Sequence, residues 1–232
     1  MLKTIIFDID GVITNLSFFH YLAWKSVFSF YNVEITNHEW ESIVGLPRMT
    51  IANRIIKKHH LSLTPDEIQQ ITEQKNALFI HLIKHGLSAN DVTNGVRQLI
   101  DDAISRGLQL VAISSSANAI LEIECLGLRN KFIYVSSYDK PAIKNLSKQE
   151  KLIISPLTLA LKTLGIKPDE CIGLEDHVDG IMEFKREGIF AVAIAHYHED
   201  IKQYGDYWVD LPEQINLEEI IFSYYKKDTS NF

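Results

Sequence analysis

The sequence predicts an α/β fold, a doubly wound parallel sheet with a small all-helical domain inserted after the first strand. Short apolar runs rich in branched residues alternate with helical segments, as expected for parallel strands joined by right-handed helical crossovers. One long block after the first run has helical periodicity and no strand-like run. We place the α/β core at residues 1–15 and 90–232, and the helical cap domain at residues 16–89.

The first predicted strand is the run Lys3–Phe7, which ends at Asp8, Asp10 and Gly11. A short continuous apolar run is typical of a strand buried on both faces of a parallel sheet. Ligands of open α/β sheets bind at the carboxyl ends of their strands. We therefore expect the two aspartates at a binding edge.

The inserted block carries apolar residues at helical spacing in residues 18–31, 40–60 and 65–85. The third segment has a clear start, because Thr64 can cap it, a proline takes the first helical position, and Glu67 stands three residues after the cap.

The second half of the chain returns to the strand–helix rhythm. The predicted strands are residues 108–113, 132–135, 170–174, 190–194 and an edge strand at 207–209; the predicted helices are residues 95–106, 117–126, 157–164, 180–187 and 217–225.

Composition narrows the function classes. The chain has 232 residues, 46% of them hydrophobic, and a net charge of −7 with scattered Lys and Arg, which argues against a nucleic-acid surface. No apolar stretch approaches the roughly 20 residues of a membrane span, and the N-terminal run is too short for a signal peptide. We expect a cytoplasmic monomer without a membrane partner, with Cys125 and Cys171 as buried thiols of a reducing compartment.

Polar clusters follow three of the predicted strands: Asp8 with Asp10, Ser114 to Ser116, and Glu175 with Asp176. The carboxyl ends of parallel strands share one edge, so these clusters can converge. Converging carboxylates repel unless a cation lies between them. Asp8, the backbone carbonyl of Asp10 and Asp176 offer the hard oxygen ligands that suit Mg²⁺.

These motifs resemble those of the haloacid dehalogenase superfamily of phosphotransferases. FDIDGVIT (Phe7–Thr14) is similar to its first motif, VAISSSAN to its second at Ser114, and IGLEDHVDGI to its fourth at Glu175 and Asp176. The resemblance covers nearly the whole chain and implies a Rossmann-like core, with the helical block as the cap. Within the superfamily the sequence most resembles the β-phosphoglucomutases, through HYLAWKSV, GLPR and QKN in the cap.

The resemblance implies a role for each motif residue. Asp8 would be the nucleophile that becomes an aspartyl phosphate, and Asp10 the general acid and base. Ser114 would bind a phosphoryl oxygen, while Asp8, Asp10, Glu175 and Asp176 would form the Mg²⁺ site. The implied substrate-binding residues are His20, Trp24, Gly45, Arg48, Lys75, Asn76, Ser115, Ser116 and Asn118.

Several positions keep a second interpretation. His20 would orient the Asp10 region and Arg48 would grip a distal phosphate, but His20 can also be a packed histidine and Arg48 a solvated surface charge. Trp24 also suits plain packing. The other histidines, including His177, show no complete metal-ligand spacing, and we expect them in surface or packing positions.

The third motif of the superfamily is a lysine, and three candidates compete. Lys140 is followed by proline as in the family, whereas Lys151 stands at the family's distance before the fourth motif. We prefer Lys151 as the catalytic lysine and keep Lys144 as a third candidate. Two further departures from the mutase pattern are Ala117, where a lysine is typical, and Leu16, where a hydroxyl residue is expected.

The sequence thus predicts a Mg²⁺-dependent phosphotransferase acting on a small phosphorylated sugar. The first hypothesis is a mutase that interconverts hexose 1-phosphate and hexose 6-phosphate through a hexose bisphosphate. The alternative is a phosphatase for a sugar or polyol phosphate, which the loss of lysine at Ala117 favours. A non-catalytic relative is a third possibility, which the complete acidic set disfavours.

Overall fold

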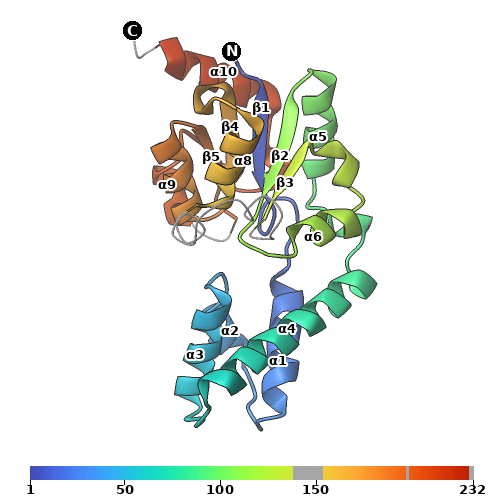
Figure 1. The fold of residues 1–232 in the computed structure, drawn as a ribbon. Coiled ribbons are helices and arrows are strands. Elements are labelled where there is room, and N and C mark those ends of the chain that lie inside the picture. Colours follow the sequence, from blue (N-terminus) through green and yellow to red (C-terminus); the bar gives the residue numbers. More distant parts are fainter. Residues whose placement is uncertain (138–153, 197–198, 230–232) are drawn as a thin grey trace. The chain divides into compact units, whose positions relative to one another are not determined.

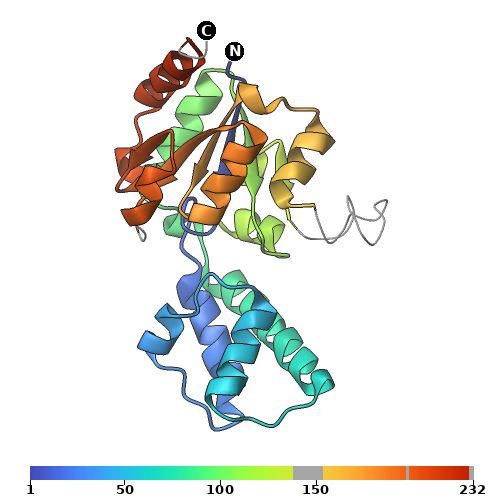
Figure 2. The same ribbon diagram turned by 90° about the vertical axis from the view of Figure 1, so that its left-hand side faces the viewer.

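The computed structural model describes residues 1–137, 154–196 and 199–229. The chain divides into two compact units, which we call the core unit (Met1–Asn15 and Ser88–Phe232) and the helical unit (Leu16–Leu87). Figures 1 and 2 show the core unit as a sheet covered by helices, and the helical unit as helices alone.

The core unit is built on a parallel sheet in the order β3-β2-β1-β4-β5-β6. This arrangement confirms the predicted doubly wound fold. The central strand β1 pairs with β2 on one side and with β4 on the other, so the topology reverses at the carboxyl end of β1. The strands are β1 (Thr4–Asp8), β2 (Gln109–Ile113), β3 (Tyr134–Ser136), β4 (Cys171–Glu175), β5 (Phe190–Ile194) and β6 (Tyr207–Val209).

Helices cover both faces of the sheet (Figures 1 and 2). Helices α8 and α9 pack on one face, where Leu157 and Phe184 join the apolar side chains of Ile6 and Val111. Phe184 lies so close to Gly173 of β4 that a Cβ atom there would meet the ring at 2.6 Å. The helices of this unit are α5 (Val96–Ser105), α6 (Ala119–Cys125), α8 (Pro156–Leu164), α9 (Val178–Glu187) and α10 (Leu217–Thr229).

The helical unit contains α1 (Ser17–Ser29), α2 (Asn37–Glu41), α3 (Arg48–Lys58) and α4 (Pro65–Gly86) around an aromatic and aliphatic core. The predicted start of α4 is confirmed, because Thr64 and Glu67 form a reciprocal capping box.

The helical spacing predicted for residues 40–60 is interrupted. The backbone turns between α2 and α3, where Gly45 adopts φ +82° and Pro47 precedes the first residue of α3. A proline cannot supply the N–H of a continuing helix, and glycine takes a positive φ at little cost. The apolar periodicity therefore belongs to two helices whose buried side chains join one hydrophobic cluster.

The two cysteines differ from the prediction in one respect. Cys171 is buried as expected, whereas Cys125 is half-buried. None of the helices in the described part of the chain is long and apolar enough to cross a membrane.

Candidate functional site

Three strand ends bring the predicted polar clusters together in the core unit. Asp8, the last residue of β1, is in register with Ile113 of β2, which Ser114 follows directly. On the other side Phe7 is in register with Leu174 of β4, so Glu175 lies beside the end of β1. The convergence follows from the parallel sheet, since residues far apart in sequence end their strands at one edge.

The loop after β1 is tightly closed. The carbonyl of Ile9 accepts hydrogen bonds from the N–H groups of Ile13 and Thr14, and the Gly11 N–H donates to the Thr14 carbonyl at 2.7 Å. Gly11 adopts φ +104°, and a Cβ atom there would lie 2.0 Å from Oδ2 of Asp176. This glycine is therefore needed twice, for the backbone conformation and for the space that the Asp176 carboxylate fills.

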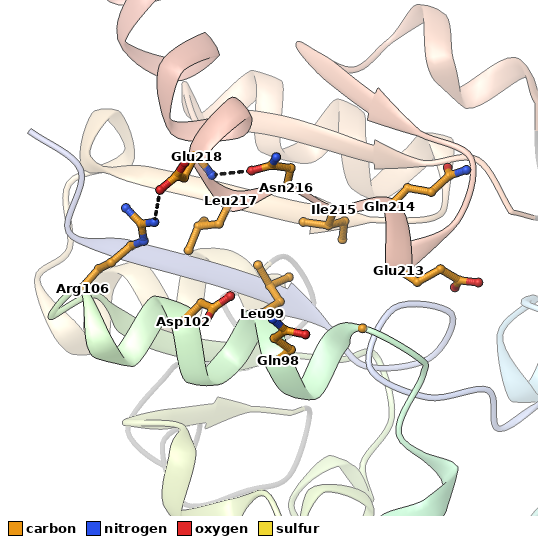
Figure 3. A pocket seen from close by; sticks show the side chains of 11 residues that line it. Gln98, Leu99, Asp102, Arg106, Glu213, Gln214, Ile215, Asn216, Leu217 and Glu218 are labelled. Atoms are coloured by element: carbon orange, nitrogen blue, oxygen red, sulfur yellow. Dashed lines mark hydrogen bonds and ion pairs between the residues drawn. The ribbon is translucent and has the colours of Figure 1, made fainter.

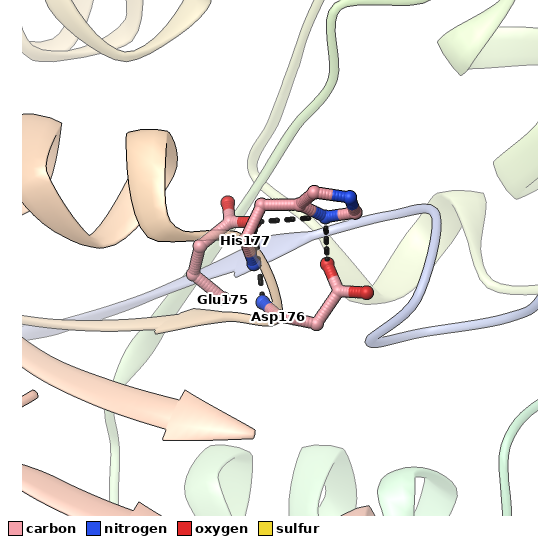
Figure 4. A group of neighbouring side chains, drawn as sticks. All are labelled: Glu175, Asp176 and His177. Carbon is pink, nitrogen blue, oxygen red and sulfur yellow. Dashed lines mark hydrogen bonds and ion pairs between the residues drawn. The ribbon is translucent and has the colours of Figure 1, made fainter. Parts of the chain in front are cut away.

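Glu175 and Asp176 are both buried at the end of β4. Oε1 of Glu175 accepts hydrogen bonds from the N–H groups of Asp176 at 3.1 Å and His177 at 2.9 Å. Its Oε2 lies where a side chain on Gly180 would fall, 2.4 Å from an ideal Cβ. The Glu175 carboxylate thus holds the turn that presents the next two side chains (Figure 4).

His177, which the sequence interpretation left as a surface or packing residue, joins this cluster. Its Nδ1 lies 2.8 Å from Oδ1 of Asp176, and Figure 4 shows the ring facing that carboxylate. One donor atom each from Glu175, Asp176 and His177 lies within 4.8 Å of the others. Its only sequence signal was its place directly after the Glu-Asp pair, because consecutive residues form no recognised ligand spacing.

The acidic cluster consists of Asp8, Asp10, Glu175, Asp176 and His177. Its carboxylates repel one another when no cation lies between them. Burial and then the charges of Glu175, Asp176 and Asp10 raise the pKa of Asp8 well above its ordinary value. Burial and Asp176 raise the pKa of Glu175 to about 8. The hydrogen bond to Asp176 raises the pKa of His177 to about 9.

The chemistry of this donor set fits a divalent cation. Asp8, Asp10 and Asp176 supply hard oxygen atoms at one sheet edge, and their mutual repulsion is relieved by positive charge between them. Gly11 leaves the Asp176 carboxylate room to face the β1 loop.

The loop after β2 is held by its own side chains. Ser114 is buried, and its Oγ accepts from the Ser116 N–H at 3.0 Å. The Ser116 hydroxyl donates to Oε1 of the fully buried Glu122 at 2.6 Å and accepts from the Asn118 N–H at 3.1 Å. Ser115 is exposed. The sequence interpretation missed Glu122, whose only signal is a carboxylate in the first turn of α6.

The helical unit holds a second cluster, of opposite charge. Nζ of Lys75 lies 2.6 Å from Nδ1 of His20, and Lys75 is only 2% exposed. The ammonium lies over the rings of Trp24, at 5.4 Å, and Phe79, at 4.7 Å, while the His20 ring stacks on Phe79 with centroids 4.1 Å apart. Trp24 is thus a packing residue that also contacts the lysine.

Arg48 and Asn76 extend this second cluster. The Arg48 guanidinium donates to Oδ1 of Asn76 at 2.8 Å. Burial, then the charges of Lys75 and Arg48, lower the pKa of His20 well below its ordinary value. Gly45 is exposed in the turn before α3. A cluster that contains an ammonium and a guanidinium group suits an anionic group.

The candidate lysines of the third motif, Lys140, Lys144 and Lys151, lie outside the described residues.

A separate open recess of about 440 Å³ lies in the core unit between α5 and the segment leading into α10 (Figure 3). Its lining is largely polar, and Arg106 donates to Glu218 at 2.8 Å across it. Among the residues that the structure describes, none of the predicted site residues lines this recess.

Comparisons with known proteins identify one family. The family model described as haloacid dehalogenase-like hydrolase matches residues 2–188. The β-phosphoglucomutase of Bacillus subtilis is 26% identical over 195 residues, which cover 83% of each chain. The fructose-1-phosphate phosphatase YqaB of Escherichia coli is 26% identical over 191 residues, covering 82% of this chain and 95% of that protein.

A solved structure extends the likeness. The crystal structure of β-phosphoglucomutase from Clostridium difficile matches with a TM-score of 0.80 and 28% identity, covering 99% of this chain and all of that one. The similar proteins thus include β-phosphoglucomutases and a fructose-1-phosphate phosphatase.

Proposed function

The chain belongs to the haloacid dehalogenase-like hydrolase family, as an enzyme that is either a phosphatase or a phosphomutase, and from this premise we propose a β-phosphoglucomutase-like reaction. In this proposal the protein interconverts hexose 1-phosphate and hexose 6-phosphate with Mg²⁺, through a phosphate carried on Asp8. The observation that carries it is the second, cationic cluster of the helical unit.

Asp8 and Asp10 divide the chemistry. A carboxylate oxygen of Asp8 forms a bond to phosphorus while the bond from phosphorus to the ester oxygen breaks. The leaving oxygen takes its proton from the Asp10 carboxyl, which stands two residues further on the closed loop. In the return step Asp10 takes the proton of the accepting hydroxyl, which then attacks phosphorus and releases Asp8.

Mg²⁺ would be held by Asp8, the Asp10 carbonyl and Asp176, and when bound it offsets the negative charge of the carboxylates and of the phosphoryl oxygens. Glu175 supports this site because its Oε1 accepts hydrogen bonds from two backbone N–H groups, those of Asp176 and His177. The Ser114 hydroxyl would bind a phosphoryl oxygen from the neighbouring strand end.

A mutase must also hold the phosphate that does not react. The guanidinium of Arg48 suits a phosphate because it presents a planar fork of donors, and Asn76 fixes its direction. Lys75 adds a buried ammonium group. The desolvation cost of this charge is offset when an anion lies near it. Simple hydrolysis does not require a second grip of this kind.

The alternative is a sugar-phosphate phosphatase, in which water replaces the second hydroxyl. It is favoured by Ala117, which removes a positive charge typical of the mutases next to the second motif. The likeness to a fructose-1-phosphate phosphatase also supports it.

One experiment separates these functions. The purified protein is incubated with Mg²⁺, a panel of hexose 1-phosphates that includes β-glucose 1-phosphate, and a trace of hexose bisphosphate. Hexose 6-phosphate and inorganic phosphate are measured in the same tubes, with an Asp8→Asn control. Hexose 6-phosphate with little free phosphate supports the mutase, free phosphate alone supports the phosphatase, and activity that persists in Asp8→Asn contradicts both.

A further inference from the structure

His177 is the one side chain of the acidic cluster that the proposed reaction leaves without a role. It stands just before α9 with its side chain 49% exposed, so a solvated ion can reach it. Its Nδ1 lies 2.8 Å from Oδ1 of Asp176 and 4.0 Å from Oε1 of Glu175.

The spacing of the two nearest donors matches that of neighbouring metal ligands. In a six-coordinate site with metal–ligand distances of about 2.1 Å, adjacent donor atoms lie about 3.0 Å apart. The separation of 2.8 Å between Nδ1 of His177 and Oδ1 of Asp176 is close to this value. Figure 4 shows the two groups facing one another across a hydrogen bond, which an ion bound by both would replace.

Glu175 holds the backbone of the two donor residues in place. The atom that does so, Oε1, is occupied by hydrogen bonds. Its Oε1 accepts from the N–H groups of Asp176 and His177, which fixes the backbone of both residues. The two side chains that follow the turn are therefore directed by the backbone and not only by their mutual hydrogen bond.

The two donors differ in the ions they favour. Carboxylate oxygen suits Mg²⁺. Imidazole nitrogen binds first-row transition ions more tightly than it binds Mg²⁺, and Mn²⁺ is the weakest-bound of these transition ions. A histidine among carboxylates thus changes which ion a site prefers.

We propose that His177 is a nitrogen ligand of the divalent-cation site beside Asp176, and that it raises the affinity of this site for Mn²⁺ relative to Mg²⁺. The inference rests on the proposed function for the existence of the cation site. It adds a ligand and a metal preference that a site of carboxylates alone does not have.

The test measures ion binding directly on the full chain. Mn²⁺ affinity is obtained from the electron paramagnetic resonance signal of the free ion, and Mg²⁺ affinity by competition, for wild type and His177→Ala. His177→Ala is expected to weaken Mn²⁺ binding by about tenfold or more, and Mg²⁺ binding by less than about threefold. His38→Ala, which removes an exposed histidine of α2, is the matched control and is expected to change neither.

A spectroscopic reading separates ligation from support. Pulsed electron paramagnetic resonance of bound Mn²⁺ is expected to show coupling to a nitrogen nucleus in wild type and in His38→Ala, and none in His177→Ala. His177→Gln keeps a hydrogen-bonding side chain without the imidazole, so it is expected to retain Mg²⁺ affinity and to lack the nitrogen coupling. Circular dichroism verifies that each variant is folded.

Two results overturn the inference: bound Mn²⁺ without nitrogen coupling in wild type, or equal weakening of both ions by His177→Ala. Failure of the proposed function looks different, because Asp8→Asn and Asp176→Asn would then leave the affinities for both ions unchanged.

Discussion

The two units of the chain each enclose a cluster of like charges, with opposite signs. The core unit gathers carboxylates around Asp8, and the helical unit gathers cations around His20. Burial and neighbouring charges of the same sign raise the pKa of Asp8 and lower that of His20. In each cluster the charged form of the side chain is therefore disfavoured. Each cluster is therefore suited to a ligand of the opposite sign. A divalent cation suits the cluster of the core unit, and a phosphate group suits that of the helical unit.

Removing the nucleophile should have the largest effect. Asp8→Asn keeps the shape of the side chain but cannot form the phosphoenzyme, so turnover is expected to fall by about 10⁴-fold or more. Product formation from hexose 1-phosphate measures it, and circular dichroism verifies the fold. A variant that keeps a tenth of wild-type turnover would show that the acidic cluster does not perform the chemistry.

Arg48→Ala should weaken the binding of the substrate phosphate by the cationic cluster. The loss of a charge-assisted contact of about 1.5–3 kcal/mol corresponds to a rise in KM of roughly tenfold to a hundredfold. Arg54→Ala removes an exposed arginine from the same helix and is the control. Equal KM values for the two variants would remove the substrate role of the cationic cluster.

Gly11→Ala should disturb the acidic cluster from within. The new Cβ would lie 2.0 Å from Oδ2 of Asp176, in a backbone with φ +104°. We expect a loss of about 1–3 kcal/mol in the free energy of unfolding and about tenfold weaker Mg²⁺ binding. Gly127→Ala is the control, because its φ of +68° is also positive but nothing lies within 4 Å of the added Cβ. Mg²⁺ affinity that falls equally in both variants would refute the close approach to Asp176.

The pH dependence of stability should have opposite signs in the two clusters. Without metal, the raised pKa of Glu175, about 8 against an ordinary value of 4.5, contributes stability that is present below about pH 4.5 and lost as the pH rises through 8. The lowered pKa of His20 contributes stability that is present above about pH 6.5 and lost as the pH falls.

Urea unfolding between pH 4.5 and 8 in the presence of a chelator measures both contributions. Glu175→Gln should reduce the loss of stability towards high pH, and His20→Gln the loss towards low pH. Unchanged slopes in the two variants would show that these groups do not titrate differently on folding.

The fold was predictable because buried parallel strands leave a simple pattern. The apolar run before Asp8 and the one before Glu175 are continuous, since both faces of the sheet are covered. Convergence of the polar strand ends then follows from the parallel order. Periodicity did not reveal the turn at Gly45, because apolar residues on both sides of it belong to the same hydrophobic cluster.

The candidate site was predictable only as far as its motifs extend. His177 was missed because its role depends on the direction of its ring towards Asp176, which the turn held by Glu175 determines. Glu122 was missed because a helical carboxylate usually faces solvent, whereas here the serine loop folds over it. Contacts of this kind depend on loop geometry that no local pattern encodes.

The role of Asp8 as the phosphate carrier is tested most directly by locating the phosphate on the chain. The protein is mixed with Mg²⁺ and a hexose bisphosphate, quenched in acid and analysed by peptide mass spectrometry, beside Asp8→Asn and a sample with chelator. One phosphate is expected on the peptide that contains Asp8, and none in either control. Turnover without phosphate on Asp8, or a phosphate that persists in Asp8→Asn, would contradict it.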